Sequence, residues 1–217
     1  LNIDTTFVDP TEVKNFQDAI LPNTKIIFAE SLGNPKLDVL DLNAIAEIAH
    51  TNGLPFIVDN TVATPYLLNP IDFGADIVIH SLTKYITGNG TSLGGIIVDA
   101  GKFNWGNGKF PEFTEPSSGY HGVVYNDVIG AASFIVKIRI EGLRDLGAAL
   151  SPFNAFQTIQ GLETLAVRIE KHSKNALQLA QWLETQELVE WVNYPGLESS
   201  KYFKLAQKYL PKGQSGI

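Results

Sequence analysis

Short apolar runs alternate with amphipathic stretches over the first hundred residues. The runs are rich in β-branched residues and predict buried strands at 24–30, 55–58, 76–79 and 94–99. Between the first two, apolar residues from Leu40 to Ala49 repeat with helical spacing. Continuous apolar strands flanked by helices are typical of a sheet covered on both faces. The pattern therefore predicts an α/β, three-layer fold with a mostly parallel sheet.

Residues 100–124 break this rhythm with Gly, Pro, Asn and five aromatic residues. A loop of this length inside a compact domain is usually functional or interfacial. The chain then turns helical, with helices expected at 128–144 and 162–187, and Ser151 begins a turn typical of a helix start. A strand is expected at 189–194. A long helix that leads into a new strand predicts two parts, a large domain at 1–155 and, at 156–217, a bridging helix with the start of a smaller α/β domain.

Polar residues follow three of the predicted strands directly. Asn34 comes after the first strand, Asp59 after the second, and Ser81, Thr83 and Lys84 after the third. In open parallel sheets, ligands bind in the crevice beyond the carboxyl ends of the strands. The same residues also have an ordinary structural reading, because many strands end in an Asp that closes a turn. By itself, Asp59 favours the structural reading.

Lys84 favours the functional reading, because lysine seldom follows a buried strand directly. We expect it to be partly buried, so that desolvation makes its amine available as a nucleophile. The hydroxyls of Ser81 and Thr83 suit a phosphate, and the glycines that follow let the backbone approach a ligand. Asp59 lies 25 residues before Lys84 and suits a protonated pyridine nitrogen. The combination points to pyridoxal phosphate.

At these positions the chain resembles the Cys/Met-metabolism family of fold-type-I pyridoxal-phosphate enzymes. The resemblance extends over essentially the whole chain. It is carried by A-E-S-L-G-N-P (29–35), I-V-D-N-T (57–61), H-S-L-T-K-Y (80–85), G-T-S-L-G-G (90–95), L-G-A-A-L-S-P-F-N-A (146–155), Q-G-L-E-T-L (160–165) and V-N-Y-P-G-L (192–197).

The resemblance implies a role for each strand-end residue. Lys84 would be the Schiff-base lysine and Asp59 the partner of the pyridine nitrogen. Ser81 and Thr83 would hold the phosphate, and Asn34 would lie near the cofactor's phenolic oxygen. It also implies a homotetramer with shared active sites, in which portions of the family's sequence outside this chain supply further phosphate and substrate-carboxylate ligands.

Within the family, residues 100–124 resemble the O-acetylhomoserine sulfhydrylases. This implies a γ-replacement reaction that converts O-acetylhomoserine and sulfide to homocysteine and acetate. A methionine γ-lyase, or a cystathionine γ-synthase or lyase, is the alternative within the family, and a non-catalytic α/β binding module is the alternative outside it. The chain departs from the family at Gly88-Asn89-Gly90, where G-H-G is usual.

Composition and charge limit the classes of binding partner and the chemistry that we expect of this chain. A net charge of −7 with scattered Lys and Arg argues against nucleic acid or an anionic membrane as the main partner. No apolar run reaches the length of a membrane span, and no cysteine is present for disulfides or thiol chemistry. The four histidines lack metal-ligand spacing, so no metal site is expected. A cytoplasmic location is the default, and a chain that begins at Leu1 and lacks Met is expected to be an internal segment.

Overall fold

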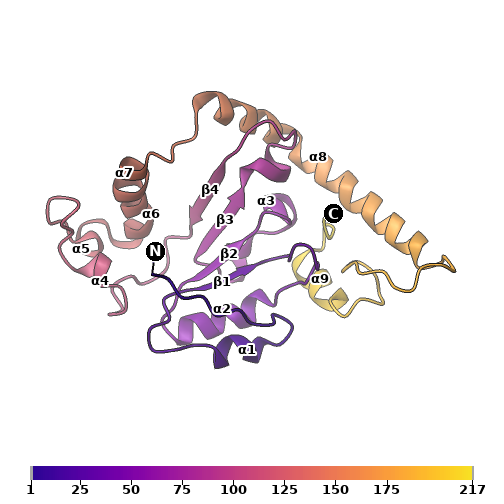
Figure 1. Ribbon diagram of the computed structural model, residues 1–217, viewed down its shortest axis with the longest axis horizontal. Coiled ribbons are helices and arrows are strands. Elements are labelled where there is room, and N and C mark those ends of the chain that lie inside the picture. Colours follow the sequence, from indigo (N-terminus) through magenta and orange to yellow (C-terminus); the bar gives the residue numbers. More distant parts are fainter. Residues whose placement is uncertain (1, 217) are drawn as a thin grey trace.

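The computed structural model describes residues 2–216, which form a four-stranded sheet with helices around it (Figure 1). The strands are β1 (Ile27–Glu30), β2 (Phe56–Asp59), β3 (Ile77–Ser81) and β4 (Gly95–Asp99). The helices are α1 (Val13–Asp18), α2 (Leu42–Thr51), α3 (Thr64–Leu67), α4 (Pro111–Thr114), α5 (Tyr125–Ile129), α6 (Ser133–Lys137), α7 (Arg144–Leu146), α8 (Pro152–Leu183) and α9 (Phe203–Tyr209). Shorter helical turns are η1 (Pro70–Phe73), η2 (Leu82–Ile86), η3 (Gly130–Ala132) and η4 (Ile138–Leu143).

The sheet runs in the order β1-β2-β3-β4, with the first three strands parallel and β4 antiparallel to β3. The expected mostly parallel α/β sheet is therefore confirmed. Each strand overlaps the apolar run that predicted it. The central strands β2 and β3 consist of buried and half-buried residues, whereas the edge strand β4 has four exposed residues.

One face of the sheet carries the larger core. Phe56, Val58 and Val78 pack there against the apolar stripe of α2, the buried face of α8 and the C-terminal residues. Helix α2 forms because its apolar residues recur every three or four positions. It ends at Thr51, and Gly53, the residue after the C-cap Asn52, has a φ of +64°, the left-handed conformation that is common at this position.

The opposite face is covered by the segment that follows β4. Ile57, Ile77 and Ile79 point to this side and pack with Trp105 and its aromatic neighbours. Helices α4 to α7 form this separate group, seen on the left in Figure 1. The aromatic residues of 100–124 are thus packing residues of this second core. The edge strand β4 stays partly exposed, with Ile96 at 44%.

Helix α8 starts earlier and ends sooner than expected. Ser151 caps it by accepting a hydrogen bond from the Asn154 amide at 3.1 Å, and Pro152 occupies the first turn. The helix continues to Leu183 without a break.

Among residues 2–216, no helix is both long enough and apolar enough to cross a bilayer.

Two expectations about secondary structure are wrong. Residues 189–194 form no strand, because no neighbouring segment supplies a hydrogen-bonding edge to them within the part of the chain described. The helix expected at 128–144 is interrupted near its start, between α5 and η3, whereas α6, η4 and α7 follow one another without a break from Ser133 to Leu146. The break falls at Gly130, which adopts a φ of +64° that a continuous helix cannot contain.

Candidate active site

The carboxyl ends of the three parallel strands bring the predicted site residues to one edge of the sheet. Glu30 pairs with Asp59 in the strand register, and Asp59 pairs with Ile79. Asp59 is therefore the last residue of β2, Ser81 is the last of β3, and Asn34 lies four residues beyond the end of β1. This shared edge is where ligands bind in open parallel sheets.

Thr61 ties the ends of β2 and β3 together. Its backbone N–H donates to Oδ1 of Asp59 at 2.9 Å, and its hydroxyl oxygen accepts the Ser81 N–H at 2.8 Å. The Asp59 carboxylate is half-buried and held in an Asx turn by this contact. Sequence reasoning assigned no role to Thr61; its place two residues after an Asp at a strand end was the available signal.

Lys84 lies in η2, immediately after β3, and its backbone departs from the helical region with φ −89° and ψ −128°. Its side chain is exposed to solvent. The expected partial burial of Lys84 is therefore wrong for this chain. The reason is its position, because the backbone leaves the sheet edge here and residues 2–216 provide no layer over this side chain.

The remaining predicted residues differ in how far their polar groups are engaged. The Thr83 hydroxyl lies 3.1 Å from the Gly94 amide nitrogen, whose N–H it accepts, and is therefore tied to the start of β4. Ser81, two residues before Thr83, is half-buried. Asn34 is exposed, and its backbone N–H donates to the Glu30 carboxylate at 2.8 Å. The phosphate and phenolic-oxygen roles of these residues stay predictions.

His80 is a buried residue of β3 that sequence reasoning had only excluded as a metal ligand. It is 5% exposed, and its Nδ1 has no hydrogen-bond partner among the described residues. Burial lowers the pKa of His80, and the negative charge of Asp59 opposes that change. His80 is therefore a neutral, buried neighbour of the predicted site.

Helix α8 holds the loop that follows Lys84. The Arg168 guanidinium donates to the carbonyl oxygens of Tyr85 at 2.9 Å and Ile86 at 3.4 Å. The hydroxyls of Thr87 and Thr158 lie 3.1 Å apart. Gly161 faces the same loop without a side chain. Sequence analysis missed this set, because the residues stand about 70 to 80 positions from the loop they hold.

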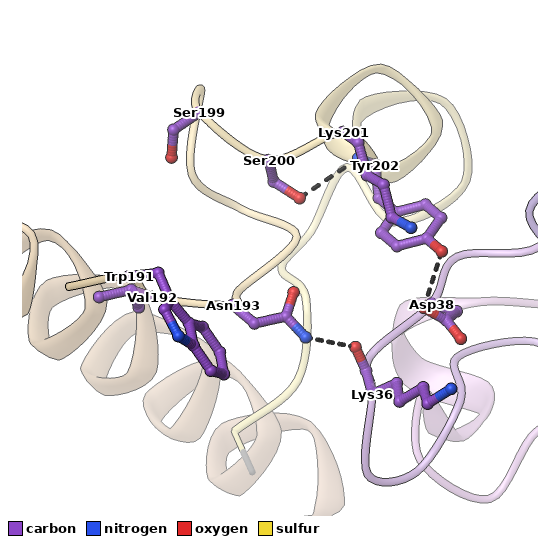
Figure 2. A pocket seen from close by; sticks show the side chains of 9 residues that line it. All are labelled: Lys36, Asp38, Trp191, Val192, Asn193, Ser199, Ser200, Lys201 and Tyr202. Carbon is purple, nitrogen blue, oxygen red and sulfur yellow. Dashed lines mark hydrogen bonds between the residues drawn. The ribbon is translucent and has the colours of Figure 1, made fainter.

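Two surface pockets lie away from these residues. One, of about 490 Å³, opens between residues 36–38 and residues 191–202 (Figure 2). The other, of about 360 Å³, lies between Ile57, the aromatic residues around Trp105 and α6. Lys84 and Asp59 line neither of them.

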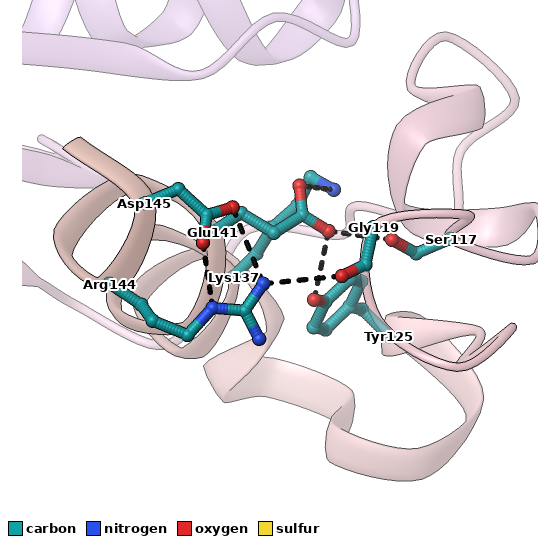
Figure 3. Close-up of polar contacts among 7 residues, drawn as sticks. All are labelled: Ser117, Gly119, Tyr125, Lys137, Glu141, Arg144 and Asp145. Atoms are coloured by element: carbon teal, nitrogen blue, oxygen red, sulfur yellow. Dashed lines mark hydrogen bonds and ion pairs between the residues drawn. The ribbon is translucent and has the colours of Figure 1, made fainter.

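A cluster around Glu141 joins the aromatic loop to the helices after it (Figure 3). The Glu141 carboxylate accepts hydrogen bonds from Ser117 at 2.6 Å, Tyr125 at 2.9 Å and Lys137 at 2.7 Å. Burial raises the pKa of Glu141, but these three hydrogen bonds outweigh it and lower the pKa overall. The cluster fastens the second core and lies apart from the strand-end residues.

The strand-end residues fit the chemistry of pyridoxal phosphate. They provide one exposed amine for covalent attachment, one carboxylate for the pyridine nitrogen, and two hydroxyls for the phosphate. They stand together at the ligand-binding edge of the sheet, beside a glycine-containing loop in which Gly90 has open space around it. Among residues 2–216 no group of three metal-ligating side chains is found.

The family model described as Cys/Met metabolism PLP-dependent enzyme matches residues 1–217. An O-acetyl-L-homoserine sulfhydrylase of Leptospira meyeri is 51% identical over all of this chain and 51% of its own length. A homocysteine/cysteine synthase of Saccharomyces cerevisiae is 48% identical over 99% of this chain and 49% of its own. The chain thus spans about half the length of the curated relatives it matches.

A solved structure agrees with the sequence matches. A Campylobacter jejuni chain, assigned as an O-acetylhomoserine (thiol)-lyase, superimposes with a TM-score of 0.91 and 42% identity, covering 96% of this chain and 52% of that one. That structure contains a lysine joined to a pyridoxyl phosphate group. The resemblance of the motifs and the three-layer fold are confirmed together, and the chain belongs to the Cys/Met-metabolism family of PLP-dependent enzymes.

Proposed function

We propose that the protein converts O-acetylhomoserine and sulfide to homocysteine and acetate, with pyridoxal phosphate attached to Lys84. The observation that carries the proposal is the gathering of Lys84, Asp59 and Ser81 at one edge of the sheet, where Thr61 links Asp59 to Ser81. The names of the relatives support the choice of substrate.

Each residue has a defined task in this proposal. The Lys84 amine would hold the cofactor and, when free, would accept the proton from the substrate α-carbon. The Asp59 carboxylate keeps a proton on the pyridine nitrogen, and its Thr61 contact fixes its orientation. When bound, pyridoxal phosphate supplies an electron sink for the negative charge that develops on the substrate.

The other residues bind and orient. Ser81 and Thr83 contribute hydroxyls to the phosphate, and Asn34 contributes its side-chain amide near the phenolic oxygen. Arg168 holds the two carbonyl groups that follow Lys84, so that the Lys84 backbone keeps one position while its amine moves a proton. The exposure of Lys84 is consistent with a site that chain segments outside 1–217, or a second subunit, complete.

The proposal includes the setting of the reaction. We place the protein in the cytoplasm as a homotetramer with shared active sites, and we keep the division into 1–155 and 156–217. The absence of cysteine from this chain suits a reducing compartment. The proposed boundary falls inside the first turn of α8, which would make that helix the bridge between the two parts.

The test is the Lys84→Ala variant of the whole protein. We expect loss of the visible absorption band and a fall in kcat/KM of roughly 10²- to 10⁴-fold or more. Lys102→Ala, which removes another exposed lysine that follows a strand, is the matched control and should retain both. Borohydride reduction followed by peptide mapping should label Lys84.

The substrate is tested separately on the same preparation. Incorporation of sulfide into homocysteine supports the sulfhydrylase, whereas release of α-ketobutyrate from methionine or cystathionine would identify a γ-lyase. A wild-type protein without any visible band after incubation with the cofactor would instead support a binding module.

A further inference from the structure

The pocket of about 490 Å³ separates two segments that are far apart in sequence (Figure 2). On one side is the turn at residues 31–39, here named the Asn34 loop, which is closed by the bridge between Leu32 and Val39. On the other side are residues 191–202, which follow α8. The loop is narrow, with the Gly33 N–H donating to the Asp38 carbonyl at 2.9 Å.

Two hydrogen bonds cross between these segments. The Asn193 side-chain amide donates to the Lys36 carbonyl at 2.6 Å, and the Tyr202 hydroxyl donates to the Asp38 carboxylate at 2.7 Å. They reach the Asn34 loop two and four residues after Asn34. Before Asn34, the loop is held through the contact of the Asn34 backbone with Glu30. The loop is thus anchored on both sides of Asn34.

Tyr202 is suited to a permanent role as a donor. It is 5% exposed, and both burial and the hydrogen bond to Asp38 raise the pKa of its phenol well above the ordinary value. It therefore stays protonated, and able to donate, at neutral pH. The Asn34 side-chain amide, by contrast, makes no hydrogen bond within residues 2–216 and is exposed. Its position is decided by the loop backbone alone.

We propose that Tyr202 and Asn193 are positioning residues, which hold the Asn34 loop so that the Asn34 amide reaches the cofactor's phenolic oxygen. The inference rests on the proposed function, because it takes the role of Asn34 from there. The pocket beside the two contacts gives the loop room to shift when either contact is removed. Residues 191–202 thereby act on the site from a distance.

The chain provides a matched control in Tyr209. This tyrosine is 2% exposed, and its hydroxyl contacts the Asp41 carboxylate and the Asn43 side chain, the latter at 3.1 Å. It is therefore a second buried tyrosine of the C-terminal segment bound to an aspartate. Its partners lie at the start of α2, beyond the Asn34 loop. Tyr209→Phe should cost similar stability without moving the loop.

The experiment uses the whole protein loaded with pyridoxal phosphate. Tyr202→Phe and Asn193→Leu are expected to shift the visible absorption band and to weaken cofactor binding about 2- to 10-fold, as for loss of one hydrogen bond. Tyr209→Phe is expected to lower the thermal midpoint as much as Tyr202→Phe while retaining the wild-type band. Asn193 is exposed, so its variant tests the proposal even if Tyr202→Phe folds poorly.

Two further variants distinguish a failure of the positioning role from a failure of the proposed function. If Asn34→Ala alters the band and affinity while Tyr202→Phe and Asn193→Leu behave as wild type, the positioning role is overturned and the proposed function stands. If Asn34→Ala also behaves as wild type, the role of Asn34 is wrong and the inference falls with it. A Lys84→Ala protein that keeps its band would overturn the proposed function itself.

Discussion

Single residues at the sheet edge derive their roles from groups that the fold places next to them. Taken alone, Asp59 is an ordinary strand-end aspartate. In the fold, the Thr61 N–H fixes the Asp59 carboxylate, and the Thr61 hydroxyl accepts the Ser81 N–H. His80 shows the same dependence, because burial lowers its pKa and keeps the ring neutral beside a carboxylate. At this scale, the electrostatic state of a side chain follows from how far it is removed from water.

Asp99, at the end of β4, allows this argument to be tested by pH. Burial raises its pKa above the ordinary 3.8, although the Gly101 N–H bonds to its Oδ1 at 2.8 Å. An aspartate with a raised pKa in the folded state destabilises the fold once ionised, so its penalty develops as pH rises above 3.8. Asp99→Asn should therefore raise the urea midpoint at pH 7, and the gain should vanish at about pH 3.

Asp145 provides a control with the opposite sign. Its pKa is lowered by the hydrogen bond from Arg144, so its ionised form favours the fold. Asp145→Asn should lower the urea midpoint slightly at pH 7 and leave it unchanged in acid. A gain from both variants at pH 7 would mean that general charge reduction, rather than burial of Asp99, is responsible.

At the scale of elements, the decisive contact is between α8 and the loop after Lys84. Arg168 and Thr158 hold that loop from one face of the helix. Gly161 lies between them in sequence and permits a close approach of helix to loop. The position of Lys84 therefore depends on a helix that begins 68 residues after it.

Gly161→Ala tests this contact. An added Cβ would stand 2.5 Å from the Ile86 carbonyl oxygen and closer still to that of Thr87, so helix and loop must separate. We expect a loss of about 1–3 kcal/mol in the free energy of unfolding, together with reduced activity. Gly142→Ala is the control, since its Cβ would meet only Ile138 Cγ2 at an ordinary 3.8 Å. Equal effects of the two variants on denaturation would refute the close-approach argument.

At the scale of the molecule, two cores hold the sheet between them. The larger includes α2, α8 and the C-terminal residues, and the smaller is the aromatic cluster built from the segment after β4. Trp105 occupies the centre of the smaller core, 4% exposed and stacked on Phe134 with ring centroids 5.1 Å apart. The long aromatic loop is thus a third layer of the fold.

Trp105→Ala should accordingly cost about 3–5 kcal/mol in the free energy of unfolding, as for removal of a buried aromatic side chain. Trp191 is 75% exposed, so Trp191→Ala should change stability by no more than about 0.5 kcal/mol. Urea titrations monitored by circular dichroism would compare them. A small effect at Trp105 would show that the aromatic layer contributes little to the stability of the sheet.

The sequence by itself determined the strands, the apolar stripe of α2 and the polar residues at the strand ends. These features are local, because the spacing of apolar residues within a short segment defines the buried face of a strand or helix. Parallel strands also end at the same edge of a sheet, so their last residues lie close together. The family motifs also identified pyridoxal phosphate as the cofactor, since they lie within short stretches of chain.

Only the tertiary structure decided the rest. Whether residues 189–194 form a strand depended on a pairing edge, which the sequence of the segment does not contain. The exposure of Lys84, the Thr61 bridge, and the contacts of Arg168 and Tyr202 with distant loops likewise join residues from separate elements. Such contacts arise from packing between elements, and the local periodicity of the sequence does not specify which elements will contact each other.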